Sequence, residues 1–218
     1  MMSEKYLEYI SSLKEKCQLG DLFAMEELAS FYYEEHPEQL NDVTLPLVLE
    51  CYETAAHGGH QKANLNLGAI YCDGHYTDAD YEKAMVYLRQ ALRGESARIA
   101  AMAACKLGDC YRCGNGVEMD YSKAFDYYLE GVLLCDYPVA LYKLGDMYQL
   151  GLFVHQDSEK AYFIYCRAKE FSQRFANAGY GEILLRLADA KLNGIGTEQN
   201  VAEANKYLAM AKRLSKQK

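Results

Sequence analysis

The sequence predicts an all-α protein, an α/α solenoid of about five helix-turn-helix repeats. Four copies of the pattern Ala/Ile-x-x-x-Leu-Gly/Ala-x-x-Tyr/Lys-x-x-Gly are centred on the small residues Gly68, Gly108, Gly145 and Ala188. Their spacings of 40, 37 and 43 residues lie in the range of helical repeat proteins. Each small residue is followed 16 positions later by an alanine on a second helical pattern. With only 3 Pro and no Trp among 218 residues, the composition also fits an all-helical chain.

The N-terminal part predicts a cap and a degenerate first repeat. Residues 1–19 are expected to form a capping helix, because a solenoid end needs a polar cover. The first repeat, at about residues 20–58, keeps only Ala24, Leu28, Ala29 and Tyr32 of the pattern. Its two helices are expected to be joined by a longer loop, from His36 through Pro46.

The middle repeats are expected at about residues 59–95, 99–134 and 138–170. In the last of these, an apolar stripe at i, i+4, i+7 and i+8 predicts an amphipathic helix around Gly145. A glycine inside a helix costs up to ~1 kcal/mol, so its recurrence indicates close packing, here against Ala161. Gly151 should end this helix, and Asp157 or Ser158 should cap the next one.

The C-terminal part predicts an insertion, a final repeat and a tail. Residues 171–181 interrupt the repeat spacing, and insertions in solenoids map to loops that often carry function. The final repeat is expected at about residues 179–212, followed by a basic tail at 213–218. The repeats together, residues 20–212, make up the predicted solenoid.

These repeats resemble the Sel1-like repeat family, which is related to tetratricopeptide repeats. The match comprises the first-helix pattern, second helices such as Lys83-Ala84-Met-Val-Tyr87, and the Gly-x-Gly turns Gly114-Asn-Gly116 and Gly194-Ile-Gly196. The resemblance implies a right-handed solenoid and a non-catalytic, bacterial adaptor that gathers other proteins. Some secreted members carry one disulfide per repeat, and some carry a β-lactamase label. This chain departs from both, because its cysteines are not at equivalent positions and no Ser-x-x-Lys box lies in a suitable setting.

Charge and hydropathy narrow the classes of partner. The net charge of −8 and the pI of about 5.2 argue against a nucleic-acid backbone or an anionic membrane as the main partner. No segment has the 18 or so apolar residues needed to cross a bilayer, and the N-terminus lacks the apolar stretch of a signal peptide. We therefore expect a cytoplasmic protein, with secretion by a leaderless route as an open alternative.

The eight cysteines give a thiol-dependent redox enzyme as one alternative function. Cys110 and Cys113 form a C-x-x-C, but within a predicted helix and not after a strand. A zinc site would need further ligands, and the nearest histidines, His75 and His155, belong to loops of neighbouring repeats. We expect ordinary thiols, and neither a metal, a cofactor nor a catalytic residue.

A repeated basic-Leu-small-Asp sequence predicts the binding surface. It occurs as Lys106 to Asp109, Lys143 to Asp146 and Arg186 to Asp189, each with a cation and an anion three residues apart on one helix face. If the first helices line a concave wall, these residues form a charged ladder. The candidate partner-binding residues are Asn66, Lys106, Asp109, Arg112, Lys143, Asp146, Gln149, Arg186 and Asp189.

The hypothesis that follows is a scaffold that binds a protein or peptide on its concave face. A secreted bacterial effector acting on host proteins is the main alternative, and the redox enzyme is the second. If the charged ladder binds the partner, charge reversal at Lys106, Lys143 and Arg186 together should leave folding intact and abolish binding.

Overall fold

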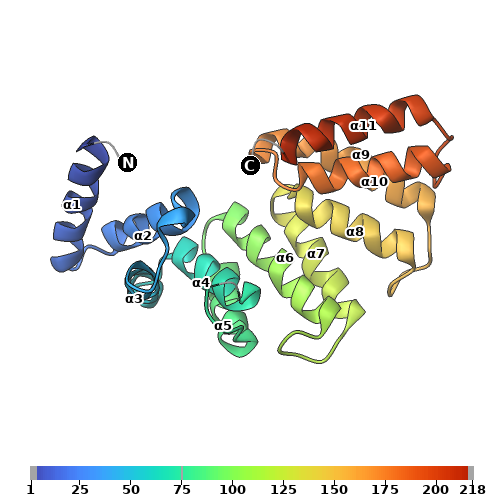
Figure 1. Cartoon of the computed structure of the whole chain (residues 1–218). Helices are drawn as coiled ribbons and strands as arrows, with labels where there is room; N and C mark the ends of the chain where they lie inside the picture. The colour runs from blue at the N-terminus through green and yellow to red at the C-terminus, as the bar shows by residue number, and fades with distance from the viewer. Residues whose placement is uncertain (1–3, 75, 216–218) are drawn as a thin grey trace. The chain divides into compact units, whose positions relative to one another are not determined.

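The computed structural model describes residues 4–74 and 76–215, and within these ranges the protein is all-helical, with eleven α-helices and no strand (Figure 1). This confirms the all-α repeat fold that the sequence predicts. The chain divides into two compact units, Met1–Ile99 and Ala100–Lys218.

The first unit is a series of helices in which each packs on the next. Helix α1 packs on α2, α2 on α3, α3 on α4 and α4 on α5. Their bounds are α1 Glu4–Gln18, α2 Leu22–Ser30, α3 Thr44–His57, α4 Gln61–Asp73 and α5 Tyr81–Leu92.

The connection between α2 and α3 is shorter and more ordered than the sequence predicts. A π-helical turn, Phe31–Glu35, extends α2, and a 3-10 turn, Pro37–Gln39, follows it. Helix α3 begins at Thr44, so the prediction of a loop through Pro46 is wrong. Proline is tolerated there because the first-turn N–H groups of a helix have no partner within the helix.

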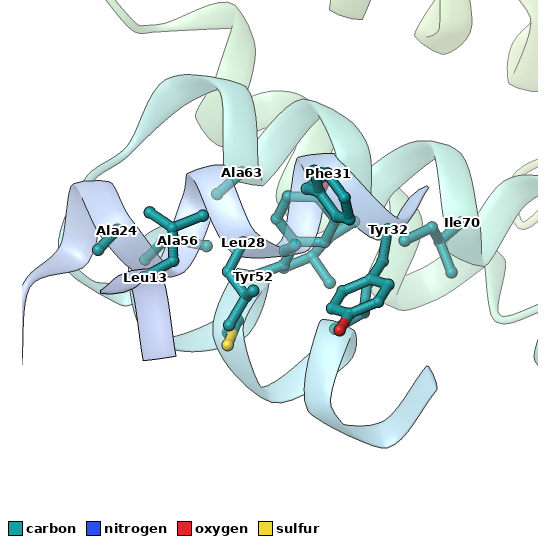
Figure 2. Close-up of a cluster of buried hydrophobic side chains, with 14 of the residues drawn as sticks. Leu13, Ala24, Leu28, Phe31, Tyr32, Tyr52, Ala56, Ala63 and Ile70 are labelled. Carbon is teal, nitrogen blue, oxygen red and sulfur yellow. The ribbon is translucent and has the colours of Figure 1, made fainter. Parts of the chain in front are cut away.

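The core of the first unit lies where α1, α2, α3 and α4 meet (Figure 2). Leu13 of α1 and Leu28 of α2 are almost completely buried, as is Tyr52 of α3. The hydroxyl of Tyr52 donates to Oγ of Ser30 at 3.2 Å, so this tyrosine keeps a partner although it is buried.

The second unit contains the remaining helices, and α6 crosses the boundary between the units. Helix α7 packs on α8, α8 on α9, α9 on α10 and α10 on α11. Their bounds are α6 Ala97–Cys113, α7 Tyr121–Cys135, α8 Pro138–Leu150, α9 Ser158–Ser172, α10 Tyr180–Asn193 and α11 Val201–Ser215.

The predicted helix boundaries are confirmed at several caps. The Asp157 carboxylate accepts the N–H of Lys160 at 2.8 Å, and Asp80 and Asp120 cap α5 and α7 in the same way. Gly151 ends α8 with φ +66°, in the left-handed region that favours glycine. The sequence therefore determines these ends locally, by side-chain caps and by glycine.

The glycine inside α4, α6 and α8 makes room for a large side chain of the paired helix. A Cβ added to Gly145 would lie 2.5 Å from Cε1 of Tyr165, and one added to Gly108 would lie 2.6 Å from Cε1 of Tyr128. The close approach is as predicted, but the group above Gly145 is the Tyr165 ring and not Ala161, which is buried one turn earlier.

The segment 171–181 is a compact turn. Helix α9 ends at Ser172, and a 3-10 turn, Gln173–Phe175, follows. Ala176 and Asn177 both have positive φ, and the Phe175 ring packs edge-on against Tyr137 at 5.6 Å. The turn is thus anchored to the core of the second unit.

Candidate functional site

One of the nine predicted site residues belongs to the first unit, and the other eight belong to the second. Asn66 lies on α4 of the first unit and is 8% exposed. Its amide nitrogen donates to Oε1 of Glu34 at 2.7 Å and to the Tyr52 hydroxyl at 2.9 Å. Its amide nitrogen is therefore used inside the unit. The other eight lie on α6, α8 and α10 of the second unit.

The predicted cations of α8 and α10 pair with aspartates of the preceding repeat. Nζ of Lys143 lies 2.7 Å from Oδ1 of Asp109, which also accepts the hydroxyl of Tyr128 at 2.7 Å. One carboxylate of α6 thus holds a tyrosine of α7 and a lysine of α8. The pair is partly shielded, since only 16% of the Lys143 side chain is exposed.

The same arrangement recurs one repeat later. Arg186 of α10 donates through Nε and Nη2 to the two oxygens of Asp146, and the Tyr165 hydroxyl donates to Oδ1 of Asp146 at 2.8 Å. The guanidinium also lies 4.5 Å from the centre of the Tyr142 ring. Burial, followed by the Asp146 charge and hydrogen bond, raises the pKa of Tyr165, so its hydroxyl stays protonated and donates.

We call each such group an inter-repeat clasp. The two clasps are Asp109 with Tyr128 and Lys143, and Asp146 with Tyr165 and Arg186. The spacing of three residues suggested ion pairs within one helix, but the main pairing is between repeats. Charge reversal at Lys143 and Arg186 would place like charges together, so the structure leads us to expect a loss of stability, against the expectation from the sequence that folding stays intact.

The remaining ladder residues are less enclosed. Lys106 is partly buried on α6, and Arg112 is exposed with Nε 3.9 Å from Oδ1 of Asp109. Asp189 is exposed on α10, and its carboxylate accepts the amide of Asn193 at 2.7 Å. Gln149, near the end of α8, is partly exposed.

A pocket between α8 and α10 brings four of the predicted residues together. Its volume is about 290 Å³. The lining residues are Asp146, Gln149, Leu150, Tyr165, Arg186, Asp189, Ala190 and Ile195. Three lining residues, Leu150, Tyr165 and Ile195, were not predicted from the sequence. A signal was present for Leu150 and Ile195, because each adjoins a glycine turn whose place beside the helix ends follows from the repeat.

The carboxylate of Asp189 and the side-chain amide of Gln149 can each bind a further partner in the pocket. The Arg186 charge is compensated by Asp146, whereas no cation lies within ion-pair distance of Asp189 among the described residues. The Gln149 side chain makes no hydrogen bond to another described residue and can both donate and accept. Leu150 is 65% exposed and supplies apolar surface. The pocket is therefore suited to a cationic or N–H-bearing group with an aliphatic stem.

The cysteines and histidines that the structure describes form no comparable site. Cys110 is buried within α6 while Cys113 is exposed on the same helix. Burial raises the pKa of the Cys51 thiol to about 12, which opposes thiolate formation at neutral pH. Among residues 4–74 and 76–215, no three His, Cys, Asp or Glu side chains are placed to hold a metal ion. His75 lies outside the described residues.

The repeats match a known family model over most of the second half and part of the first. The model of the Sel1 repeat matches residues 61–95, 101–132, 138–170 and 184–216. The chain belongs to the Sel1 repeat family. Repeats of this kind generally mediate protein interactions. The four matched segments correspond to the four full copies of the sequence pattern, while the degenerate first copy is not matched.

Solved structures support the fold of this Sel1 repeat protein. A Sel1 repeat protein from Oxalobacter formigenes is 23% identical, with a TM-score of 0.69, covering 88% of this chain and 71% of that one. A protective antigen present in uropathogenic Escherichia coli strains is also 23% identical, with a TM-score of 0.62; the match covers 94% of this chain but 48% of that one. A Klebsiella pneumoniae protein is 16% identical, with a TM-score of 0.56 and coverages of 94% and 92%.

None of the curated proteins matches the sequence of this Sel1 repeat protein. Within the described part of the chain, no helix has the length and apolar character to span a bilayer.

Proposed function

We propose that this Sel1 repeat protein is an interaction scaffold that binds an extended peptide in the pocket between α8 and α10. The observation that carries the proposal is the convergence of Asp146, Gln149, Arg186 and Asp189, which come from two repeats, around one 290 Å³ pocket. Such a pocket is large enough for one or two side chains, so it would recognise a short stretch of a larger partner.

The pocket chemistry favours a peptide with a lysine or arginine. Asp189 supplies an anionic group that no described cation neutralises, and Leu150 and Ile195 supply apolar surface for the methylene stem. The Gln149 amide can pair with the peptide backbone. Arg186 and Asp146 hold each other in place, so the polar groups of the pocket are already positioned before binding.

An array of extended peptides with Arg, Gln or Glu at the central position tests this proposal against the wild-type chain. We expect retention to fall by about tenfold or more from Arg to Gln, because a hydrogen bond between charged groups is replaced by a neutral one. Glu should abolish retention, since it faces Asp189. Equal retention of the three series would contradict the proposal.

A pair of variants tests the position of the site. Leu150→Lys should weaken retention of the Arg peptides, because it removes apolar surface and places a like charge beside the bound cation. Leu133→Lys, on α7, is the matched control, because Leu133 is also exposed but lies outside the pocket. Circular dichroism should show both variants folded. An unchanged affinity in Leu150→Lys would place the site elsewhere.

A further inference from the structure

Two cysteines from different helices of the first unit lie next to each other. Cys17 is in the last turn of α1, and Cys51 is in the middle of α3. Their side chains are hydrogen-bonded to each other, and neither is part of a disulfide. A thiol can both donate and accept weakly, so this contact places the two sulfur atoms side by side. Cys51 is only 5% exposed, whereas Cys17 is partly exposed and can be reached from solvent.

Met25 of α2 brings a third sulfur atom to the same place. It lines a pocket of about 310 Å³ together with Cys17 and Cys51. Cys17 and Met25 also pack against the core that contains Cys51 and Leu28, where α1, α2 and α3 meet (Figure 2). We call Cys17, Met25 and Cys51 the three-sulfur pocket. Because each comes from a different helix, the packing of the first unit determines how the three sulfur atoms are spaced.

The surroundings of the sulfur atoms are largely apolar. Leu28, which is almost completely buried, and Leu47 both line the pocket. The polar lining residues, Lys14, Gln18, Glu50 and Thr54, are all exposed. A ligand that enters the pocket to reach Cys51 is therefore surrounded mainly by sulfur and aliphatic carbon.

This set of side chains discriminates between metal ions. Zn²⁺ takes three or four protein ligands, from Cys, His, Asp or Glu side chains. Among the described residues, no third side chain of these types is placed to complete such a site. Cu(I) is a softer ion, and thiolate and thioether ligands favour it. Two cysteines with a methionine in the same pocket are therefore matched to Cu(I) and poorly matched to Zn²⁺.

We propose that Cys17 and Cys51 bind one Cu(I) ion as thiolates, with the thioether of Met25 as a weaker third ligand. Binding forms two copper–sulfur bonds and releases the two thiol protons to solvent, and no electron is transferred. The positive ion compensates thiolate charge that the apolar pocket would otherwise disfavour. This pocket shares no residue with the pocket between α8 and α10, so the proposal does not depend on peptide binding there.

Anaerobic titration of the full chain with Cu(I), in competition with the chromophoric chelator bicinchoninate, measures this site. We expect the wild type to withdraw one ion per chain from the chelator. Cys17→Ala and Cys51→Ala should each weaken retention by about a hundredfold or more, because a change even to an outer partner of a metal ligand costs about 10–100-fold. Far-UV circular dichroism should show both variants folded, since alanine keeps a small apolar side chain at each position. No withdrawal of copper by the wild type would overturn the proposal.

Cys113→Ala is the matched control, because Cys113 is an exposed thiol on α6 and lies outside the pocket. Its retention of Cu(I) should equal that of the wild type. An equal loss in Cys113→Ala and Cys17→Ala would show that the thiols bind copper singly, and would contradict the proposal. Zn²⁺ held as tightly as Cu(I) by the wild type would contradict it too. Intact mass spectrometry should show copper gained and two hydrogens lost; loss of two hydrogens alone would mean a disulfide in place of the metal site.

Met25→Leu separates a metal ligand from a packing residue, because leucine keeps a similar volume and has no sulfur. It should weaken Cu(I) retention, but by less than the cysteine variants do. On addition of Ag(I), another soft monovalent ion, the methyl NMR signal of Met25 should shift, while that of Met102, partly buried on α6, should not. Equal shifts of the two signals, or unchanged retention in Met25→Leu, would contradict the assignment of Met25 as a ligand.

Discussion

At the scale of single residues, the two clasp aspartates link one repeat to the next through charged hydrogen bonds. Asp109 and Asp146 each accept a tyrosine hydroxyl from their own repeat and a cation from the next one. Hydrogen bonds to charged groups contribute more than neutral ones, and partial burial limits competition from water. Lys143 and Arg186 therefore already have partners within the fold, and a ligand would have to compete with these aspartates for them.

A double-mutant cycle on Asp109→Asn and Lys143→Met measures one clasp. We expect a coupling of about 1 kcal/mol in the free energy of urea unfolding, because the pair is charged but still partly exposed. The control is the cycle on Asp136→Asn and Arg167→Met, whose more exposed side chains also form an ion pair at 2.7 Å. That pair should couple by only a few tenths of a kcal/mol. Equal coupling in the two cycles would show that burial adds nothing at Asp109.

The residues of the clasps were visible in the sequence, but their pairing was not. Lys143 stands three residues before Asp146, which favours an ion pair within the helix when only local spacing is known. The actual partner, Asp109, is 34 residues away. It could be chosen only once the stacking of α6 and α8 was known, because that stacking brings the two side chains together.

At the scale of helices, the glycine inside α8 leaves the space that the Tyr165 ring of α9 occupies. Gly145→Leu should lower the free energy of unfolding by about 1–3 kcal/mol, because the new side chain collides with the buried Tyr165 ring. Chemical denaturation measures the change. Gly181→Ala is the control: a Cβ there meets no atom within 4 Å, so stability should stay the same or rise slightly. An unchanged stability in Gly145→Leu would contradict the argument from close approach.

Helix boundaries were predicted well where a local residue determines them. Asp157 caps α9 and Gly151 ends α8, and both signals lie within one turn of the boundary. The boundary near Pro46 was missed, because proline permits both a loop and a first helical turn. Phe153 has φ +66° where the matching turns have Gly116 and Gly196, and its ring centre lies 5.6 Å from that of Phe125.

At the scale of the molecule, the two units have separate cores. Leu13, Leu28 and Tyr52 belong to the core of the first unit, and Leu184 and Leu187 to a core of the second. Stability in repeat proteins is close to a sum of repeat and nearest-neighbour contributions. A local change should therefore act mainly on the unit that contains it.

Native-state hydrogen exchange of the Gly145→Leu variant tests this independence. Amides of α8, α9 and α10 should lose roughly five- to 150-fold in protection, as expected from a loss of about 1–3 kcal/mol. Amides of α2, α3 and α4 should keep their protection, because their core contains no residue of the second unit. An equal loss in both units would mean that they unfold as one cooperative body. In that case a partner bound at α8 and α10 would also stabilise the first unit. The reason is that opening of the first unit would then also open the binding site, so its free energy would include the cost of releasing the partner.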